Sequence, residues 1–124
     1  MSDQGLGESF RSAFSGLANA LRGQRSLRLQ LVAAAAVIAL GAWLDLPAVD
    51  WAVLALTIGF VLVSEMFNTA AEALVDLISP EYRPLAGVVK DVSAGAVLLV
   101  SVLSVIVGLL VLGPPLCVRL FGVP

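Results

Sequence analysis

The sequence predicts an all-α membrane protein, in which three transmembrane helices follow an amphipathic helix that lies at the membrane interface. Of its 124 residues, 60% are hydrophobic and only 13% are charged, and the mean hydropathy is +1.03. A soluble domain of this length cannot cover so much apolar surface with so few charges. The apolar residues also form three runs that are long enough to cross a bilayer as helices.

Composition narrows the chemistry that this chain can perform. The net charge of −2 and the absence of a basic run argue against a nucleic-acid partner. The chain has no histidine, which is the usual general base and zinc ligand, so acid–base or metal chemistry must rest on carboxylates. The single Cys117 cannot form an intrachain disulfide. With no internal repeat or linker, residues 1–124 are expected to form one domain.

The N-terminal region predicts a helix over about residues 8–25. Residues 1–8 form a short polar segment with no apolar core, so we do not expect a secretory signal there. The apolar positions that follow recur at helical spacing: Phe10, Phe14, Leu17 and Leu21. This pattern is typical of a helix in the membrane interface. The alternative is a soluble arm folded on the cytoplasmic face of the protein itself.

Three transmembrane spans are expected over about residues 29–46, 51–78 and 85–112. The second is the longest, at roughly 42 Å for a rise of 1.5 Å per residue. Because the hydrocarbon layer is about 30 Å thick, the C-terminal end of this span should project into the interface. We expect Pro114 and Pro115 to end the third span.

The distribution of basic residues predicts the orientation. All but one of the Lys and Arg side chains precede the first span or lie in or beside the second loop: Arg11, Arg22, Arg25, Arg28, Arg83 and Lys90. By the positive-inside rule, the N-terminus and the loop at residues 79–90 are therefore cytoplasmic.

A stripe of polar side chains interrupts the second span. We define it by its four members, which share one helix face because they lie three, four, seven and eleven positions apart: Glu65, Asn68, Glu72 and Asp76. Each ionisable group at the centre of a bilayer costs roughly 2.5–3.5 kcal/mol. A stripe this costly predicts a function, although helix–helix hydrogen bonding alone is the structural alternative.

The stripe suits phosphoryl transfer. Glu65 and Glu72 lie two turns apart, about 10 Å along the axis, whereas Mg²⁺ holds oxygens at about 2.0–2.1 Å, so one ion cannot bind both. Glu72, near the membrane boundary, suits a metal shared with a nucleotide. Glu65 is deeper and suits a general base for a lipid hydroxyl. Lys90, at the same level on the third span, can neutralise phosphate charge.

These residues resemble a known motif. Glu65-x-x-Asn68-Thr69-Ala70-x-Glu72-x-x-Val75-Asp76, followed by Lys90-Asp91-x-x-x-Gly95-Ala96-Val97, is similar to the small prokaryotic diacylglycerol kinase family, which includes the undecaprenol kinases. The resemblance covers roughly residues 10–112. It implies a homotrimeric, Mg²⁺- and ATP-dependent lipid kinase of the bacterial inner membrane, with active sites at subunit boundaries.

The resemblance also implies roles for individual residues. Glu65 would be the catalytic base and Glu72 a metal ligand. The nucleotide site would include five further positions: Asn68, Lys90, Asp91, Gly16 and Arg28. Gln24 is a departure, because the family usually has a second metal-binding glutamate there; a neutral amide weakens the metal site unless Asp91 or the ATP phosphates complete it. Ala71 is a smaller departure, where a larger aliphatic residue is usual.

The acceptor lipid and two other functions remain open at this point. The segments at residues 10–16 and 24–29 resemble the undecaprenol kinase branch more than the diacylglycerol kinase branch. A second hypothesis is a small proton-coupled transporter with Glu65 as the proton carrier. A third, suggested by Gln24, is an inactive relative that binds nucleotide or lipid without turnover. Three spans cannot easily enclose a site against lipid, which independently favours an oligomer.

Overall fold

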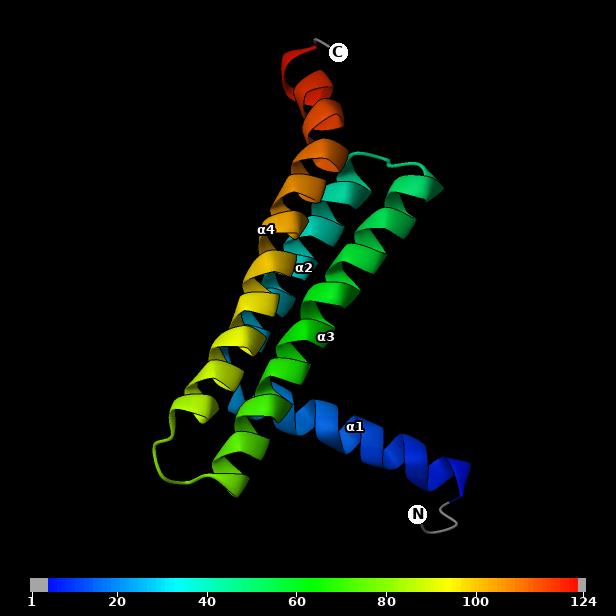
Figure 1. Ribbon diagram of the computed structural model, residues 1–124. Coiled ribbons are helices and arrows are strands. Elements are labelled where there is room, and N and C mark those ends of the chain that lie inside the picture. The colour runs from blue at the N-terminus through cyan, green and yellow to red at the C-terminus, as the bar shows by residue number, and fades with distance from the viewer. Residues whose placement is uncertain (1–4, 123–124) are drawn as a thin grey trace.

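The computed structural model describes residues 5–122 and contains four helices in this range. They are α1 (Leu6–Gly23), α2 (Arg25–Trp43), α3 (Ala48–Ile78) and α4 (Pro84–Phe121). Helices α2, α3 and α4 run up, down and up in a bundle, and α1 projects from its lower end (Figure 1). The predicted all-α fold class is confirmed. Residues 1–4 of the polar leader and the last two residues of the apolar tail lie outside the described range.

Helices α2, α3 and α4 are the three that are long and apolar enough to cross a membrane. A small buried cluster joins them near the α2–α3 loop: Leu44, Leu46, Leu54 and Leu112. Most other large apolar side chains of the bundle are exposed. A chain that leaves so much apolar surface open is suited to lipid or to other copies of itself, not to water.

The apolar face of α1 is not packed against the bundle. None of its residues is buried, and Phe10 and Phe14 are 59% and 68% exposed. This observation favours the membrane-interface interpretation over a soluble arm folded on the same chain.

A sharp break separates α1 from α2 at Gln24, whose backbone is extended with φ −119° and ψ 109°. Arg28 spans the break, because its Nη1 donates to the carbonyl oxygens of Leu21, at 3.4 Å, and Arg22, at 3.0 Å. The last carbonyls of a helix lack partners within it. Arg28 therefore supplies those partners and fixes the angle at which α1 leaves the bundle.

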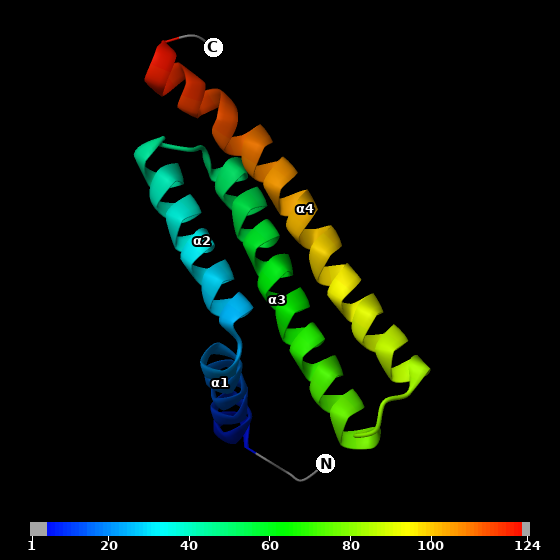
Figure 2. The ribbon, with the colours of Figure 1, turned by 90° about the vertical axis from the view of Figure 1, so that its left-hand side faces the viewer.

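The prediction that Pro114 and Pro115 end the last span is wrong, because α4 continues through both prolines to Phe121. A proline removes one backbone hydrogen bond and bends a helix without necessarily ending it. The axis of α4 changes direction at its orange-to-red end (Figure 2). Arg119 holds this extension: its Nη2 donates to the Trp43 carbonyl oxygen at 2.9 Å, and its guanidinium lies 4.9 Å from the centre of the Trp43 ring.

Candidate active site

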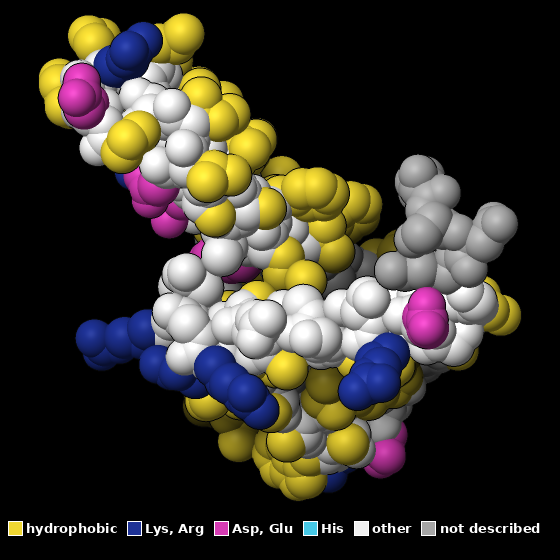
Figure 3. All heavy atoms as spheres, turned by 90° about the horizontal axis from the view of Figure 1, so that it is seen from below, with side chains coloured by type: hydrophobic (Ala, Val, Ile, Leu, Met, Phe, Trp, Pro, Cys, Tyr) yellow, Lys and Arg dark blue, Asp and Glu magenta, His cyan; other side chains and the backbone are white. Residues whose placement is uncertain are grey.

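The polar stripe lies in the half of α3 that is closest to the α1–α2 junction. Helices α3 and α4 extend past this junction, so the lower turns of α3 have α4 beside them but not α2 (Figures 1 and 2). Viewed from this end, Lys, Arg, Asp and Glu side chains gather over α1 and the lower turns of α3 and α4 (Figure 3). The stripe therefore lies at the end of the bundle that α2 does not cover, where most of the charged side chains gather.

Glu65 is the one charged side chain that the described part of the chain buries, at 6% exposure. Ser26, in the first turn of α2, donates from its Oγ to Glu65 Oε2 at 3.1 Å. The expectation that Glu65 lies deeper than Glu72 agrees with this burial. Sequence reasoning missed Ser26, which it used only to compare branches of a family.

Asn68 faces α4. Its Oδ1 lies 2.7 Å from the hydroxyl of Ser93, which also lies 3.0 Å from the Lys90 carbonyl oxygen. A hydroxyl has one proton and can donate to one of these acceptors at a time. When Asn68 Oδ1 accepts that proton, the NH₂ group of Asn68 keeps two donors for a ligand. Such donors suit phosphate oxygens.

Lys90 reaches back from α4 to the end of the stripe. Its Nζ lies 2.7 Å from Asp76 Oδ1, and the two side chains are 41% and 66% exposed. The carboxylate that holds this lysine is Asp76, whereas its neighbour in sequence, Asp91, is exposed.

The stripe therefore meets two neighbours. Glu65 contacts α2 through Ser26, and Asn68 and Asp76 contact α4 through Ser93 and Lys90. Glu72 lies between these contacts and is half-buried. The arrangement places a buried carboxylate at one end of the stripe, the amide donors of Asn68 about one turn from it, and the ammonium of Lys90 at the other end.

No three carboxylate or thiol side chains converge on a common point within residues 5–122. The stripe is thus not a preformed protein cage for a metal. Mg²⁺ usually keeps several waters and binds through one or two carboxylates together with substrate phosphates. A single half-buried carboxylate such as Glu72 fits an ion that arrives with a nucleotide, and the amide of the half-buried Gln24 can add only a neutral oxygen.

Three of the predicted nucleotide residues stand apart from these contacts. No hydrogen bond or ion pair in the described part of the chain joins Gly16, Arg28 or Asp91 to the stripe. Gly16 is exposed on α1, and a Cβ placed there would meet no atom within 4 Å. Arg28 uses Nη1 to cap α1, and its remaining N–H groups are available to other partners.

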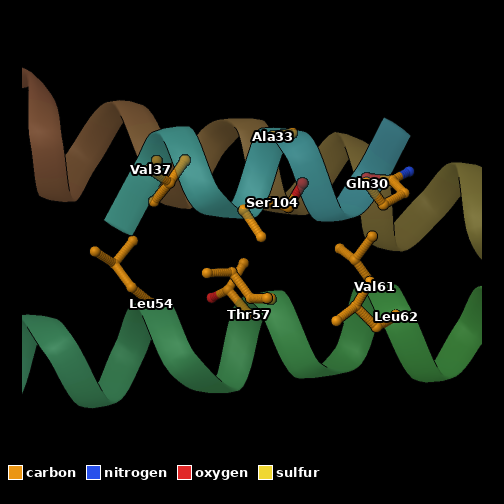
Figure 4. Close-up of a pocket in the computed structure, with 11 residues that line it drawn as sticks. Gln30, Ala33, Val37, Leu54, Thr57, Val61, Leu62 and Ser104 are labelled. Atoms are coloured by element: carbon orange, nitrogen blue, oxygen red, sulfur yellow. The ribbon is translucent and has the colours of Figure 1, made fainter. Parts of the chain in front are cut away.

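Two hollows lie along α3. A cavity of about 90 Å³ lies between α2, α3 and α4, where the polar side chains on its wall are Gln30, Thr57 and Ser104 (Figure 4). Thr57 and Ser104 donate to carbonyls of their own helices, so their hydroxyl protons are already engaged and only the oxygens can accept from a ligand. The second hollow is a shallow, mostly apolar groove between α3 and α4 that reaches Asn68 and Ser93. An apolar groove that ends at polar groups suits an amphiphilic ligand.

Comparison with known proteins identifies one family. The sequence profile of the prokaryotic diacylglycerol kinases matches residues 11–112. The diacylglycerol kinase of Synechocystis sp. is 45% identical over 109 residues, which cover 87% of this chain and 62% of that relative. The chain therefore spans less than two thirds of the length of this protein.

Two further relatives match over most of their own length. The undecaprenol kinase of Bacillus subtilis is 38% identical over 109 residues, covering 88% of this chain and 89% of that relative. The diacylglycerol kinase of Escherichia coli is 33% identical over 94 residues, covering 76% and 77%. These relatives differ in the lipid that their names specify.

Proposed function

The chain belongs to the prokaryotic diacylglycerol kinase family, and we propose that it transfers the γ-phosphoryl group of ATP to the hydroxyl of a membrane lipid. The observation that supports this most directly is the stripe itself: a buried Glu65 lies on the same helix face as Asn68 and Asp76, and the latter holds Lys90. The transporter alternative receives no support from the comparisons and does not explain Lys90.

In the proposed reaction, Glu65 is the general base. The lipid hydroxyl oxygen attacks the γ-phosphorus, its proton passes to the Glu65 carboxylate, and the bond between the γ-phosphorus and the oxygen that bridges to ADP breaks. Positioned bases of this kind contribute typically 10²–10⁴-fold to a rate. Burial keeps water away from Glu65, so the base is directed to the lipid hydroxyl and not to solvent.

Asn68 and Lys90 bind the phosphates in this proposal. The amide donors of Asn68 and the ammonium of Lys90 neutralise charge on the transferring group. A magnesium ion, when bound with ATP, would neutralise further phosphate charge. Glu72 would hold it, with Gln24 offering an amide oxygen. Asp91, Arg28 and Gly16 are proposed to contact the remainder of the nucleotide.

The acceptor is proposed to be undecaprenol, from the resemblance of residues 10–16 and 24–29 to that branch. The relatives carry both names, so the choice needs a direct comparison. Purified protein would be assayed on diacylglycerol and undecaprenol at equal mole fraction in the same membrane. We expect a higher kcat/KM for undecaprenol, and a preference for diacylglycerol would contradict this assignment.

The proposed arrangement in the bacterial inner membrane follows from the site. ATP is cytosolic, so the stripe and Lys90 must face the cytoplasm, which also places the N-terminus there, in agreement with the positive-inside rule. The exposed apolar side chains on α3 and α4 support contacts with other copies of the chain, and we propose a homotrimer.

The central test compares wild type with Glu65→Gln in membranes supplied with labelled ATP. The amide keeps the shape of the side chain but cannot accept the proton, so we expect at least about a 100-fold loss of lipid phosphorylation. Glu81→Gln, at an exposed acid in the α3–α4 loop, is the matched control and should retain activity. Activity of Glu65→Gln within tenfold of wild type would show that Glu65 is not the base. Robust wild-type turnover would exclude the inactive-relative hypothesis.

A further inference from the structure

The contact between Ser26 and Glu65 joins two residues that are 39 positions apart in the sequence. Ser26 Oγ donates to Glu65 Oε2 at 3.1 Å, and the carboxylate that receives this bond is 6% exposed. It is also the one hydrogen bond that the Glu65 carboxylate accepts within residues 5–122, since the Thr69 hydroxyl donates to the backbone carbonyl of Glu65. A buried carboxylate is costly without such partners.

Three features of the α1–α2 junction determine where Ser26 lies. It lies in the first turn of α2, next to Leu27, which is 2% exposed and prevents the helix from turning about its axis. Gln24, whose backbone is extended, immediately precedes α2. Arg28 then connects α2 to the end of α1 by donating to the last carbonyls of α1. The first turn of a helix also carries unpaired N–H groups and a partial positive charge, which favour a nearby carboxylate.

From this geometry we infer that Ser26 is a positioning residue for the proposed base, an inference that rests on the proposed lipid kinase activity. The Ser26 hydroxyl donates its hydrogen bond to Oε2 and thereby holds the carboxylate in one orientation. Oε1 is then the oxygen that faces the substrate and accepts its proton.

A positioning role differs from a packing role in what it changes. Ser26 is itself exposed in one chain, so its removal leaves no large cavity. Loss of a bond that orients Glu65 should lower kcat and leave the KM for ATP nearly unchanged. Loss of packing would instead lower the unfolding midpoint in detergent.

The test uses three variants of the full chain in membranes. Ser26→Ala removes the donor, and Ser26→Thr keeps a hydroxyl. Ser104→Ala is the matched control, because the Ser104 hydroxyl donates to the Ser101 carbonyl of its own helix. We expect Ser26→Ala to lower kcat roughly tenfold, as for a lost hydrogen bond to a charged group, with a KM for ATP within about twofold. Ser26→Thr should restore kcat, and Ser104→Ala should match wild type.

Infrared spectroscopy provides the second measurement. The carboxyl bands of Glu65, identified by their absence in Glu65→Gln, should shift in Ser26→Ala and return in Ser26→Thr without any substrate, because the frequency of these bands depends on the hydrogen bond that Oε2 accepts. A Ser26→Ala variant with wild-type kcat and unmoved infrared bands would overturn the inference.

The outcomes separate this inference from the proposed function. If wild type phosphorylates lipid and Glu65→Gln does not, but Ser26→Ala is unaffected, then the positioning role alone is wrong. If wild type shows no kinase activity, the proposed function is wrong, together with the catalytic role inferred for Ser26. The infrared bands would then still test whether the Ser26 hydroxyl donates a hydrogen bond to the Glu65 side chain.

Discussion

Lys90 of α4 and Asp76 of α3 form an ion pair, in which Nζ lies 2.7 Å from Oδ1. The two side chains are 41% and 66% exposed, so water screens the attraction and the pair contributes little to stability. Its main effect is therefore geometric. The carboxylate holds the ammonium beside the stripe, where the proposed phosphates would bind.

The first prediction concerns Asp76→Asn. Without the carboxylate, the lysine side chain samples more rotamers and is less often in place for phosphate. We expect the KM for ATP to rise about three- to tenfold, while the unfolding midpoint in detergent changes little, as for an exposed ion pair. Lys90→Met should be more severe, because it removes the charge itself. Steady-state kinetics with ATP as the varied substrate measures both effects.

Glu81→Gln serves as the control for a general change in surface charge, because Glu81 lies in the loop between the same two helices. A KM for ATP that is unchanged in Asp76→Asn, but raised in Lys90→Met, would show that the lysine is positioned without help from Asp76.

Helical periodicity predicted the stripe well, because residues on one face of one helix are determined by their spacing. The position of Glu65 along the span predicted that it lies deeper than Glu72, and the structure buries this residue. Periodicity does not specify which neighbouring helix a given residue meets. The contacts of Glu65 with Ser26 and of Asn68 with Ser93 depend on helix rotation and depth, so sequence reasoning missed both partners.

The end of α4 could not be predicted for a different reason. A proline pair usually ends a helix in water, where the freed carbonyls can bind solvent. In an apolar run, continuing the helix satisfies more backbone groups than leaving it does. Arg119 adds a contact with Trp43 that is 76 positions distant in sequence, and spacing within one helix cannot reveal it.

The second prediction follows from this tether. Arg119→Gln removes the guanidinium group that stacks on the Trp43 ring and whose Nη2 lies 3.7 Å from Asp45 Oδ2. We expect faster hydrogen exchange in the last turns of α4, from about residue 116 onward, with lipid kinase activity within about twofold of wild type. Arg83→Gln, at the opposite end of α4, is the control. A large loss of activity in Arg119→Gln would indicate that the extension supports the distant site.

The third prediction concerns Gln24, the neutral residue at the break between α1 and α2. If its side chain faces the proposed magnesium ion, then Gln24→Glu adds a second carboxylate ligand. The magnesium concentration for half-maximal activity should fall by about three- to tenfold, and kcat should not decrease. Activity titrated with MgCl₂ at fixed ATP measures this change, and Gln30→Glu, deeper in α2, tests whether any added acid has the same effect. An unchanged magnesium dependence would place Gln24 away from the metal.

The last prediction concerns how chains share a site. Helix α1 points away from its own bundle, and Gly16 on it faces open space, whereas the stripe lies on α3 (Figure 1). If Gly16 contacts nucleotide, it should serve the stripe of a neighbouring chain. Gly16→Leu and Glu65→Gln should each be inactive alone, yet an equal mixture should recover about a quarter of wild-type activity, since half of the α1 helices and half of the stripes are intact and combine at random. Doubly substituted chains mixed with wild type control for assembly. No recovery from mixed, co-purified chains would mean that α1 and the stripe of one chain form the same site.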